Sequence, residues 1–135
     1  MRILGLDYGS ARIGVALGDT ETKVASPWRI LVNEDQQDAI ERILEIARQE
    51  KADQVVIGIP RPLNDPTRET DQAKEIRVFA EALRVAGATV IEEDETLSTA
   101  MAGQQMQERG EKGKRDDLAA AVILQSYLDR YGVSS

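Results

Sequence analysis

The sequence contains no cysteine and no histidine among its 135 residues. Without cysteine, the chain has no thiolate nucleophile, no disulfide and no thiolate zinc site. Without histidine, it has no imidazole base and no imidazole metal ligand, which excludes Ser-His-Asp hydrolases, histidine-bound zinc enzymes and facial-triad iron sites. If the protein is an enzyme, carboxylates or a bound cofactor must therefore carry the chemistry.

Aromatic residues and long apolar runs are also scarce. Aromatic side chains make up 4% of the chain, too few for stacking to be the main device for binding single-stranded nucleic acid. No run approaches the roughly 18 apolar residues of a membrane span, and the N-terminus lacks the apolar region of a signal peptide. We expect a soluble, cytoplasmic protein with no membrane partner. Its net charge of −7 argues against non-specific coating of polyanions.

Hydrophobic patterning predicts one domain over residues 1–135, with strands and helices in a fixed order. The second strand is the clearest, because Ile13, Val15 and Leu17 alternate with glycine and alanine and so give a large face and a small face. Pro27 indicates that the third strand is an edge strand or bends near its start. The predicted strands span about 3–9, 13–18, 24–32, 55–59 and 89–91, the last ending in the acids 92–95; the predicted helices span about 34–50, 76–83 with Gly87 as C-cap, 97–107 and 116–130.

This order favours an α/β fold built on a mixed sheet. Three strands joined by short turns come first and are expected to be antiparallel, and helices then alternate with the remaining strands. We therefore predict a five-stranded mixed sheet with helices packed on both faces. Loops are predicted over 61–70 and 108–115.

Acidic residues occupy three notable places in this arrangement. Asp7 ends the most hydrophobic strand, where an ionised side chain is costly unless something compensates it. Asp94 and Glu95 end the fifth strand, where an acid is usually a solvated turn residue. Asp116 and Asp117 open the last helix, where an acid is ordinarily a cap or a partner of the helix dipole.

Together the three groups of acids predict a metal site. If the first and fifth strands run parallel near the sheet centre, their ends lie close, and the start of the last helix can bring a third carboxylate. Like charges at that distance repel unless a cation compensates them, and oxygen ligands suit Mg²⁺ or Mn²⁺. Such ions activate water and stabilise the leaving oxygen in phosphodiester hydrolysis. Helical spacing places Asp116 and Asp117 both on the apolar sector and does not choose between them.

Four blocks of the sequence carry a resemblance to a known family. They are Leu6-Asp7-Tyr8-Gly9-Ser10-Ala11-Arg12-Ile13-Gly14-Val15-Ala16, Gly58-Ile59-Pro60, Asp94-Glu95-Thr96-Leu97-Ser98-Thr99, and Asp116 with Ala119-Ala120 and Ile123-Leu124-Gln125. In these blocks, which cover nearly the whole chain in the same order, the sequence resembles the YqgF/RuvX family. The resemblance implies an RNase H-like fold and a nuclease related to Holliday-junction resolvases, whose usual assigned role is processing the 5′ end of pre-16S ribosomal RNA.

The resemblance also implies which acids form the site. It makes Asp7 the first metal ligand, the Asp94-Glu95 pair the source of the second, and Asp116 rather than Asp117 the third. Within the pair we favour Glu95, because adjacent strand residues point in opposite directions.

Two features of the sequence depart from the family pattern. Thr96 stands where an arginine commonly follows the acid pair, which puts a phosphate contact by that arginine in doubt. Pro62 and Pro66 occupy a loop that usually contains more glycine.

Basic residues gather beside the last acid in the sequence. Either they form a solvated loop with a solubilising charge, or they contact phosphates next to the acids. The candidates for nucleic-acid binding are Arg12 on the first hairpin and Arg109, Lys112, Lys114 and Arg115, which with Glu111 give the segment before Asp116 a charge of +3.

We expect a metal-dependent nuclease acting on structured RNA first and branched DNA second. A non-catalytic nucleic-acid-binding or ribosome-assembly module is the main rival, since it would keep the fold and the basic segment without needing a metal. An actin-like or hexokinase-like ATPase uses a similar Asp-x-Gly hairpin but needs two such domains. A junction resolvase needs two coordinated active sites and hence a homodimer, which the sequence does not establish.

Overall fold

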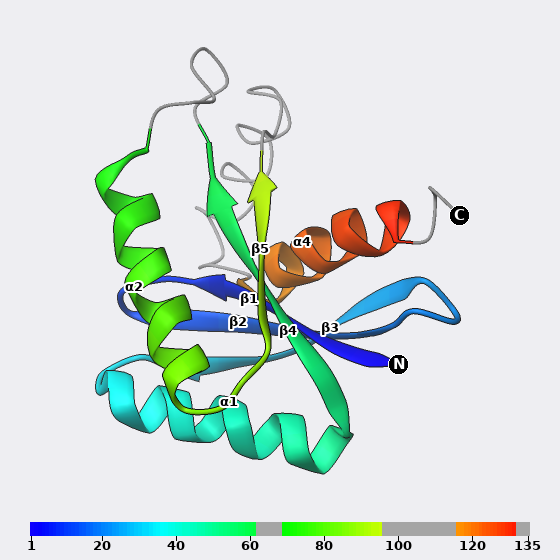
Figure 1. Cartoon of the computed structure of the whole chain (residues 1–135), viewed down its shortest axis with the longest axis horizontal. Coiled ribbons are helices and arrows are strands. Elements are labelled where there is room, and N and C mark those ends of the chain that lie inside the picture. The colour runs from blue at the N-terminus through cyan, green and yellow to red at the C-terminus, as the bar shows by residue number, and fades with distance from the viewer. Residues whose placement is uncertain (62–68, 96–115, 132–135) are drawn as a thin grey trace.

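The computed structural model describes residues 1–61, 69–95 and 116–131. The predicted helix at 97–107, the loop at 108–115 and most of the loop at 61–70 lie outside these ranges. None of the helices in the described ranges is long and apolar enough to cross a membrane. The elements, shown in Figure 1, are β1 (Arg2–Tyr8), β2 (Arg12–Asp19), β3 (Val24–Val32), α1 (Gln36–Glu50), β4 (Ala52–Pro60), α2 (Asp71–Val85), β5 (Val90–Glu95) and α4 (Asp116–Arg130).

The five strands form one mixed sheet in the order β3-β2-β1-β4-β5. β1, β2 and β3 are antiparallel neighbours, and β4 and β5 continue the sheet parallel to β1. The predicted mixed sheet is confirmed, as is the parallel direction of the first and fifth strands. The condition on which the predicted metal site was argued, that both strands lie near the sheet centre, is met by β1 but not by β5, which is an edge strand separated from β1 by β4. The crossover through α1 carries the chain from β3 at one edge to the free side of β1, where β4 pairs, and the crossover through α2 then adds β5 outside β4.

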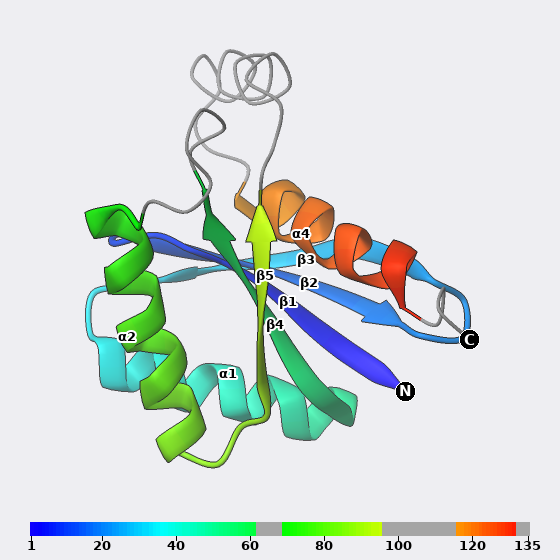
Figure 2. The same cartoon turned by 45° about the horizontal axis from the view of Figure 1, so that its top comes forward.

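Helices cover both faces of the sheet, as predicted. Figure 2 shows α1 and α2 on one face and α4 on the other. The larger core lies between the sheet and α1 and α2, and a smaller one lies beneath α4. In β2, Ile13 and Val15 belong to the larger core, whereas Ala16 belongs to the smaller one. The small face of β2 recognised in the sequence is therefore the face on which α4 rests.

The ends of α1 and α2 follow from their capping residues. Asp35 caps α1 by accepting hydrogen bonds from the backbone amides of the first turn, so the helix begins two residues later than predicted. Thr70 caps α2 in the same way. Gly87 follows α2 with φ 111°, and its N–H donates to the carbonyl of Arg84 at 3.0 Å. This is a Schellman-type ending and confirms the predicted role of Gly87.

β3 is an edge strand and also carries an irregularity. Val15 of β2 pairs with Arg29 and Ala16 pairs with Pro27, so Trp28 is an extra residue in β3. Proline has no N–H to donate to a ladder, and it is tolerated at an edge or a bulge. Both features that the proline predicted are therefore present.

Candidate active site

Asp7 lies near the end of β1, on the face of the sheet that carries α4. Its neighbours Leu6 and Tyr8 are buried in the core beneath α1 and α2, so strand alternation places Asp7 on the other face. Gly5 faces the same side of the sheet as Asp7, because the two are two residues apart in the strand. A Cβ added to Gly5 would lie 2.7 Å from the Cβ of Leu124 in α4. Asp7 is half-buried and pairs with Gly14 of β2. The charge at the end of this buried strand is thus next to α4.

Asp116, the first residue of α4, lies directly against Gly14. A Cβ added to Gly14 would lie 1.9 Å from the carbonyl oxygen of Asp116 and 2.8 Å from the amide nitrogen of Asp117. Because Gly14 pairs with Asp7, this contact brings Asp7 and Asp116 to the same place on the sheet. Asp116 is 7% exposed, whereas Asp117 is of intermediate exposure. The structure therefore brings together the first and third predicted acids, and it buries Asp116 more deeply than Asp117.

Arg12, the first residue of β2, reaches the same acid. Its Nε lies 3.5 Å from Oδ2 of Asp116, and its side chain is 41% exposed. Arg12 is two residues before Gly14 and so lies on the α4 face of the strand. The structure thus places this predicted nucleic-acid-binding residue beside Asp116, with part of its side chain open to solvent.

Asn33 holds the turn between β1 and β2 and has no counterpart among the residues predicted for the site. Its side-chain Nδ2 donates a hydrogen bond to the carbonyl oxygen of Gly9 at 2.8 Å. Its backbone N–H donates a hydrogen bond to the carbonyl oxygen of Ala11 at 2.9 Å. The side chain is buried, so these hydrogen bonds replace those it would make with water. Asn33 therefore fixes the turn that connects Asp7 to Arg12. An asparagine after a strand normally indicates a turn, and nothing in the sequence tells which backbone atoms it binds.

Glu93 of β5 is a second acid on the α4 face, and it is 2% exposed. Ser126 Oγ donates to its Oε2 at 3.1 Å, and Arg130 pairs with its Oε1. Burial raises the pKa of the neighbouring Tyr127 phenol, and the charges of Tyr131 and Glu93 act in the same direction. These contacts fasten α4 to the far edge of the sheet, so Glu93 has a structural role.

Asp94 lies on the opposite face from Glu93, away from Asp7 and Asp116. It accepts a hydrogen bond from Arg61 Nε at 3.2 Å, and its side chain is 62% exposed. Strand alternation across this acidic segment is therefore as expected, and it separates Asp94 from the site. The strand also continues through the acids instead of stopping before them, because Asp94 and Glu93 each pair with an arginine.

Comparison with known proteins places the chain in a family. The model of a family described as "RuvX: Holliday junction resolvase" matches residues 1–130. The chain belongs to the RuvX family. A relative from Thermus thermophilus, named "Putative pre-16S rRNA nuclease", is 36% identical over 135 residues that cover 96% of this chain and 98% of the relative. A relative of the same name from Streptococcus gordonii is 38% identical over 141 residues, covering 96% and 99%.

Solved structures confirm the RNase H-like fold for this RuvX-family protein. The Holliday junction resolvase of fowlpox virus matches with a TM-score of 0.56 and 18% identity, covering 96% of this chain and 98% of that one. RuvC of Thermus thermophilus matches with a TM-score of 0.54 and 17% identity, covering 95% and 94%. At these identities the likeness concerns the arrangement of the elements.

The donor set of the RuvX-family site suits a hard divalent cation. Asp7 and Asp116 offer carboxylate oxygens from a strand and a helix, and Mg²⁺ and Mn²⁺ prefer oxygen ligands. In residues 1–61, 69–95 and 116–131, no group of three or more acids is arranged to hold a metal ion. The third predicted ligand, Glu95, has its backbone paired with Pro60, and its side chain lies outside the described part. The predicted basic residues Arg109, Lys112, Lys114 and Arg115, and Thr96, Pro62 and Pro66, also lie outside it.

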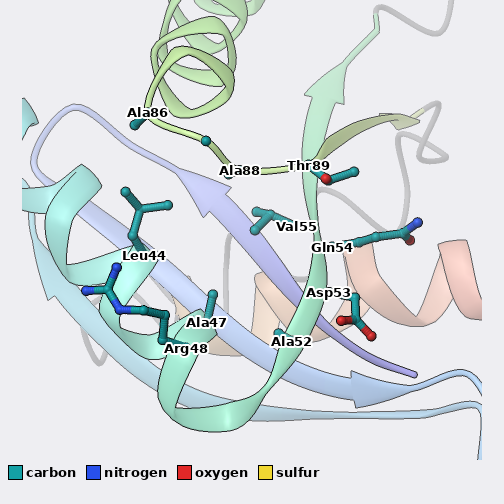
Figure 3. Close-up of a pocket in the computed structure, with 11 residues that line it drawn as sticks. Leu44, Ala47, Arg48, Ala52, Asp53, Gln54, Val55, Ala86, Ala88 and Thr89 are labelled. Atoms are coloured by element: carbon teal, nitrogen blue, oxygen red, sulfur yellow. The ribbon is translucent and has the colours of Figure 1, made fainter.

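A cavity of about 270 Å³ lies at the other end of the parallel strands. Figure 3 shows it between α1, the start of β4 and the segment before β5. Leu44, Ala47 and Val55 contribute apolar surface to its lining, and Arg48 and Asp53 contribute charged groups. Because β1, β4 and β5 are parallel, this cavity is at the sheet end opposite Asp7. It contains none of the residues predicted for the active site.

Proposed function

We propose that this RuvX-family protein is a metal-dependent endonuclease that processes the 5′ end of pre-16S ribosomal RNA. Family membership supports a hydrolase of phosphodiester bonds, and the names of the relatives support the RNA substrate. The observation that carries the proposal is the contact of Asp116 with Gly14, which brings Asp116 beside Asp7. The chain has neither histidine nor cysteine, so carboxylates are the side chains that suit a metal ion for hydrolysis.

The acids would act as ligands held on rigid elements. Asp7 and Asp116 would hold Mg²⁺ or Mn²⁺ together with Glu95, and the ion supplies Lewis-acid chemistry for attack by water on phosphorus. Asp7 is fixed by its pairing with Gly14 of β2 and by the residue before it, Leu6, which pairs with Ile57 of β4. Asp116 is fixed by the seat of α4 on β2. Such anchoring keeps the carboxylates in position without rearrangement during the reaction.

The overall charge of −7 is compatible with a nucleic-acid substrate. Several acids are already paired with arginines in the structure, among them Glu93 and Asp94. Arg12 is in place to contact a phosphate beside the acids, and we propose the same role for Arg109, Lys112, Lys114 and Arg115. Contacts of this kind position the backbone without reading its sequence.

The proposed function is tested by cleavage assays with purified protein. Mg²⁺ or Mn²⁺ should support cleavage of an RNA that carries the 5′ leader of 16S ribosomal RNA, and a chelator should stop it. A four-way DNA junction tests the second candidate, which the family description favours and which requires a homodimer. Preferential junction cleavage by a dimer would replace the RNA substrate with branched DNA. Binding of RNA without any cleavage would favour a non-catalytic assembly module.

The acid pair at the end of β5 gives a sharper test. Glu95→Gln should lower the cleavage rate by about 10²-fold or more, since it removes a charged ligand and each 1.36 kcal/mol of lost stabilisation is a factor of ten. Asp94→Asn should stay within about threefold of the wild type, since losing an exposed ion pair has little effect. Initial rates at saturating Mn²⁺ measure both. A larger loss for Asp94→Asn than for Glu95→Gln would assign the ligand to Asp94.

A further inference from the structure

Arg12 contacts an acid that the proposed function assigns to the metal site. We infer that Arg12 is an internal counter-cation, which pairs with Asp116 in the metal-free protein and is released to bind substrate phosphate when a divalent ion takes its place. This inference rests on the proposed function. It adds that metal binding and phosphate binding are coupled through one side chain.

The geometry of the pair favours an exchange of partners. Asp116 is 7% exposed, and a buried carboxylate needs compensation by nearby donors or charges. Arg12 approaches it through Nε at 3.5 Å, which is longer than the 2.7–2.9 Å or so of a strong charge-assisted hydrogen bond. A divalent ion at Asp116 and Asp7 would therefore displace a weak contact.

The position of Arg12 also allows it to turn toward a substrate. Its side chain is 41% exposed, so the guanidinium can leave Asp116 without crossing the core. Its backbone stays fixed, because Arg12 pairs with Val32 and follows the turn that Asn33 holds. A released arginine beside the reacting phosphodiester offers the planar donors that suit phosphate oxygens.

Competition of this kind predicts opposite effects on two ligands. Removing the positive charge of Arg12 makes the site more negative, so Mn²⁺ should bind more tightly in the absence of nucleic acid. The same change removes a phosphate contact, so RNA should bind less tightly in the presence of metal. A residue with only a structural role would weaken both kinds of binding, because its loss would disturb the ligands.

The test is Mn²⁺ binding to the full chain, measured by isothermal titration calorimetry without nucleic acid. Arg12→Ala should bind Mn²⁺ about five- to tenfold more tightly than the wild type, the size expected for one charge a few ångströms from a divalent ion in a solvated site. Arg12→Lys, which keeps the charge, should stay within about twofold. Arg42→Ala is the matched control, because it removes an exposed arginine paired with Asp38 on α1 and should leave Mn²⁺ affinity unchanged.

The outcomes separate the inference from the proposed function. Tighter Mn²⁺ binding by Arg12→Ala, with a thermal unfolding midpoint close to that of the wild type, supports the exchange. Unchanged or weaker binding by Arg12→Ala, alongside clear binding by the wild type, overturns the role of Arg12 and leaves the nuclease proposal intact. If neither protein binds Mn²⁺, the metal-dependent function fails and the inference fails with it. If Arg42→Ala tightened Mn²⁺ binding as much as Arg12→Ala, the change would follow from the net charge of the protein alone. That result would also overturn the role of Arg12.

Discussion

Asp7→Asn is expected to lower the rate of RNA cleavage by about 10³-fold or more while the protein stays folded. Asparagine has nearly the same size and keeps one oxygen, but it lacks the negative charge that a divalent cation needs from its ligand. Metal ions contribute several kcal/mol of transition-state stabilisation, and each 1.36 kcal/mol is a factor of ten. Cleavage at saturating Mn²⁺ measures the loss. Activity within about tenfold of the wild type would remove Asp7 from the mechanism.

Stability provides an independent measurement for the same variant. Asp7 and Asp116 are acids at one place on the sheet, so removing one charge should leave the thermal unfolding midpoint in chelator unchanged or higher. Mn²⁺ should raise the midpoint of the wild type, since a ligand at about 100 times its Kd adds roughly 2.7 kcal/mol. That increase should be largely lost in Asp7→Asn. Asp53→Asn is the matched control, because Asp53 is an exposed acid at the opposite end of the parallel strands.

Patterns along the chain were sufficient to predict most of the fold. The alternation of large and small residues in β2 and the apolar stripe of α1 each lie within a single element. They can therefore be recognised without knowing which elements pack against it. The order of strands in the sheet is different, because it depends on where each helical crossover places the next strand. The predicted metal site supposed that β1 and β5 run parallel near the sheet centre, whereas β4 lies between them and β5 is at the edge. The alternation of helices and strands was enough to predict that β1 and β5 are parallel. It was not enough to predict which strands are neighbours in the sheet.

The acids show the same contrast between what one element reveals by itself and what depends on packing between elements. Asp7 could be recognised from the sequence because a charge at the end of an apolar strand is unusual. The choice between Asp116 and Asp117 could not be made from helical spacing, because it depends on how α4 sits on β2. Its seat at Gly14 leaves Asp116 buried and Asp117 more exposed. Asn33 was missed for the same reason, since its partners Gly9 and Ala11 are reached across the fold.

Gly14→Ala is expected to damage both the fold and the site, because the glycine is the seat of α4. The added Cβ would lie 1.9 Å from the carbonyl oxygen of Asp116 and 2.2 Å from its carbonyl carbon. These are backbone atoms, so the start of the helix must move. We expect a loss of about 3 kcal/mol or more in the free energy of unfolding, at the upper end for overpacking. Misplacing Asp116 by about 1 Å should lower cleavage by about 10²-fold in the fraction that remains folded.

Gly18→Ala separates this effect from the general effect of adding a methyl group to β2. Gly18 lies four residues along the same strand and face, but its added Cβ would meet the methyl ends of Leu124 at 2.9 Å and Leu128 at 3.0 Å, and backbone only at 3.2 Å, the carbonyl oxygen of Val24. Flexible side chains can shift, so we expect a loss of about 1 kcal/mol and nearly normal cleavage per folded molecule. Denaturant unfolding and Mn²⁺ titration of both variants measure the contrast. Equal stability and equal Mn²⁺ affinity in the two would mean that the contact at Gly14 does not position Asp116, and the geometric basis of the proposed metal site would fail.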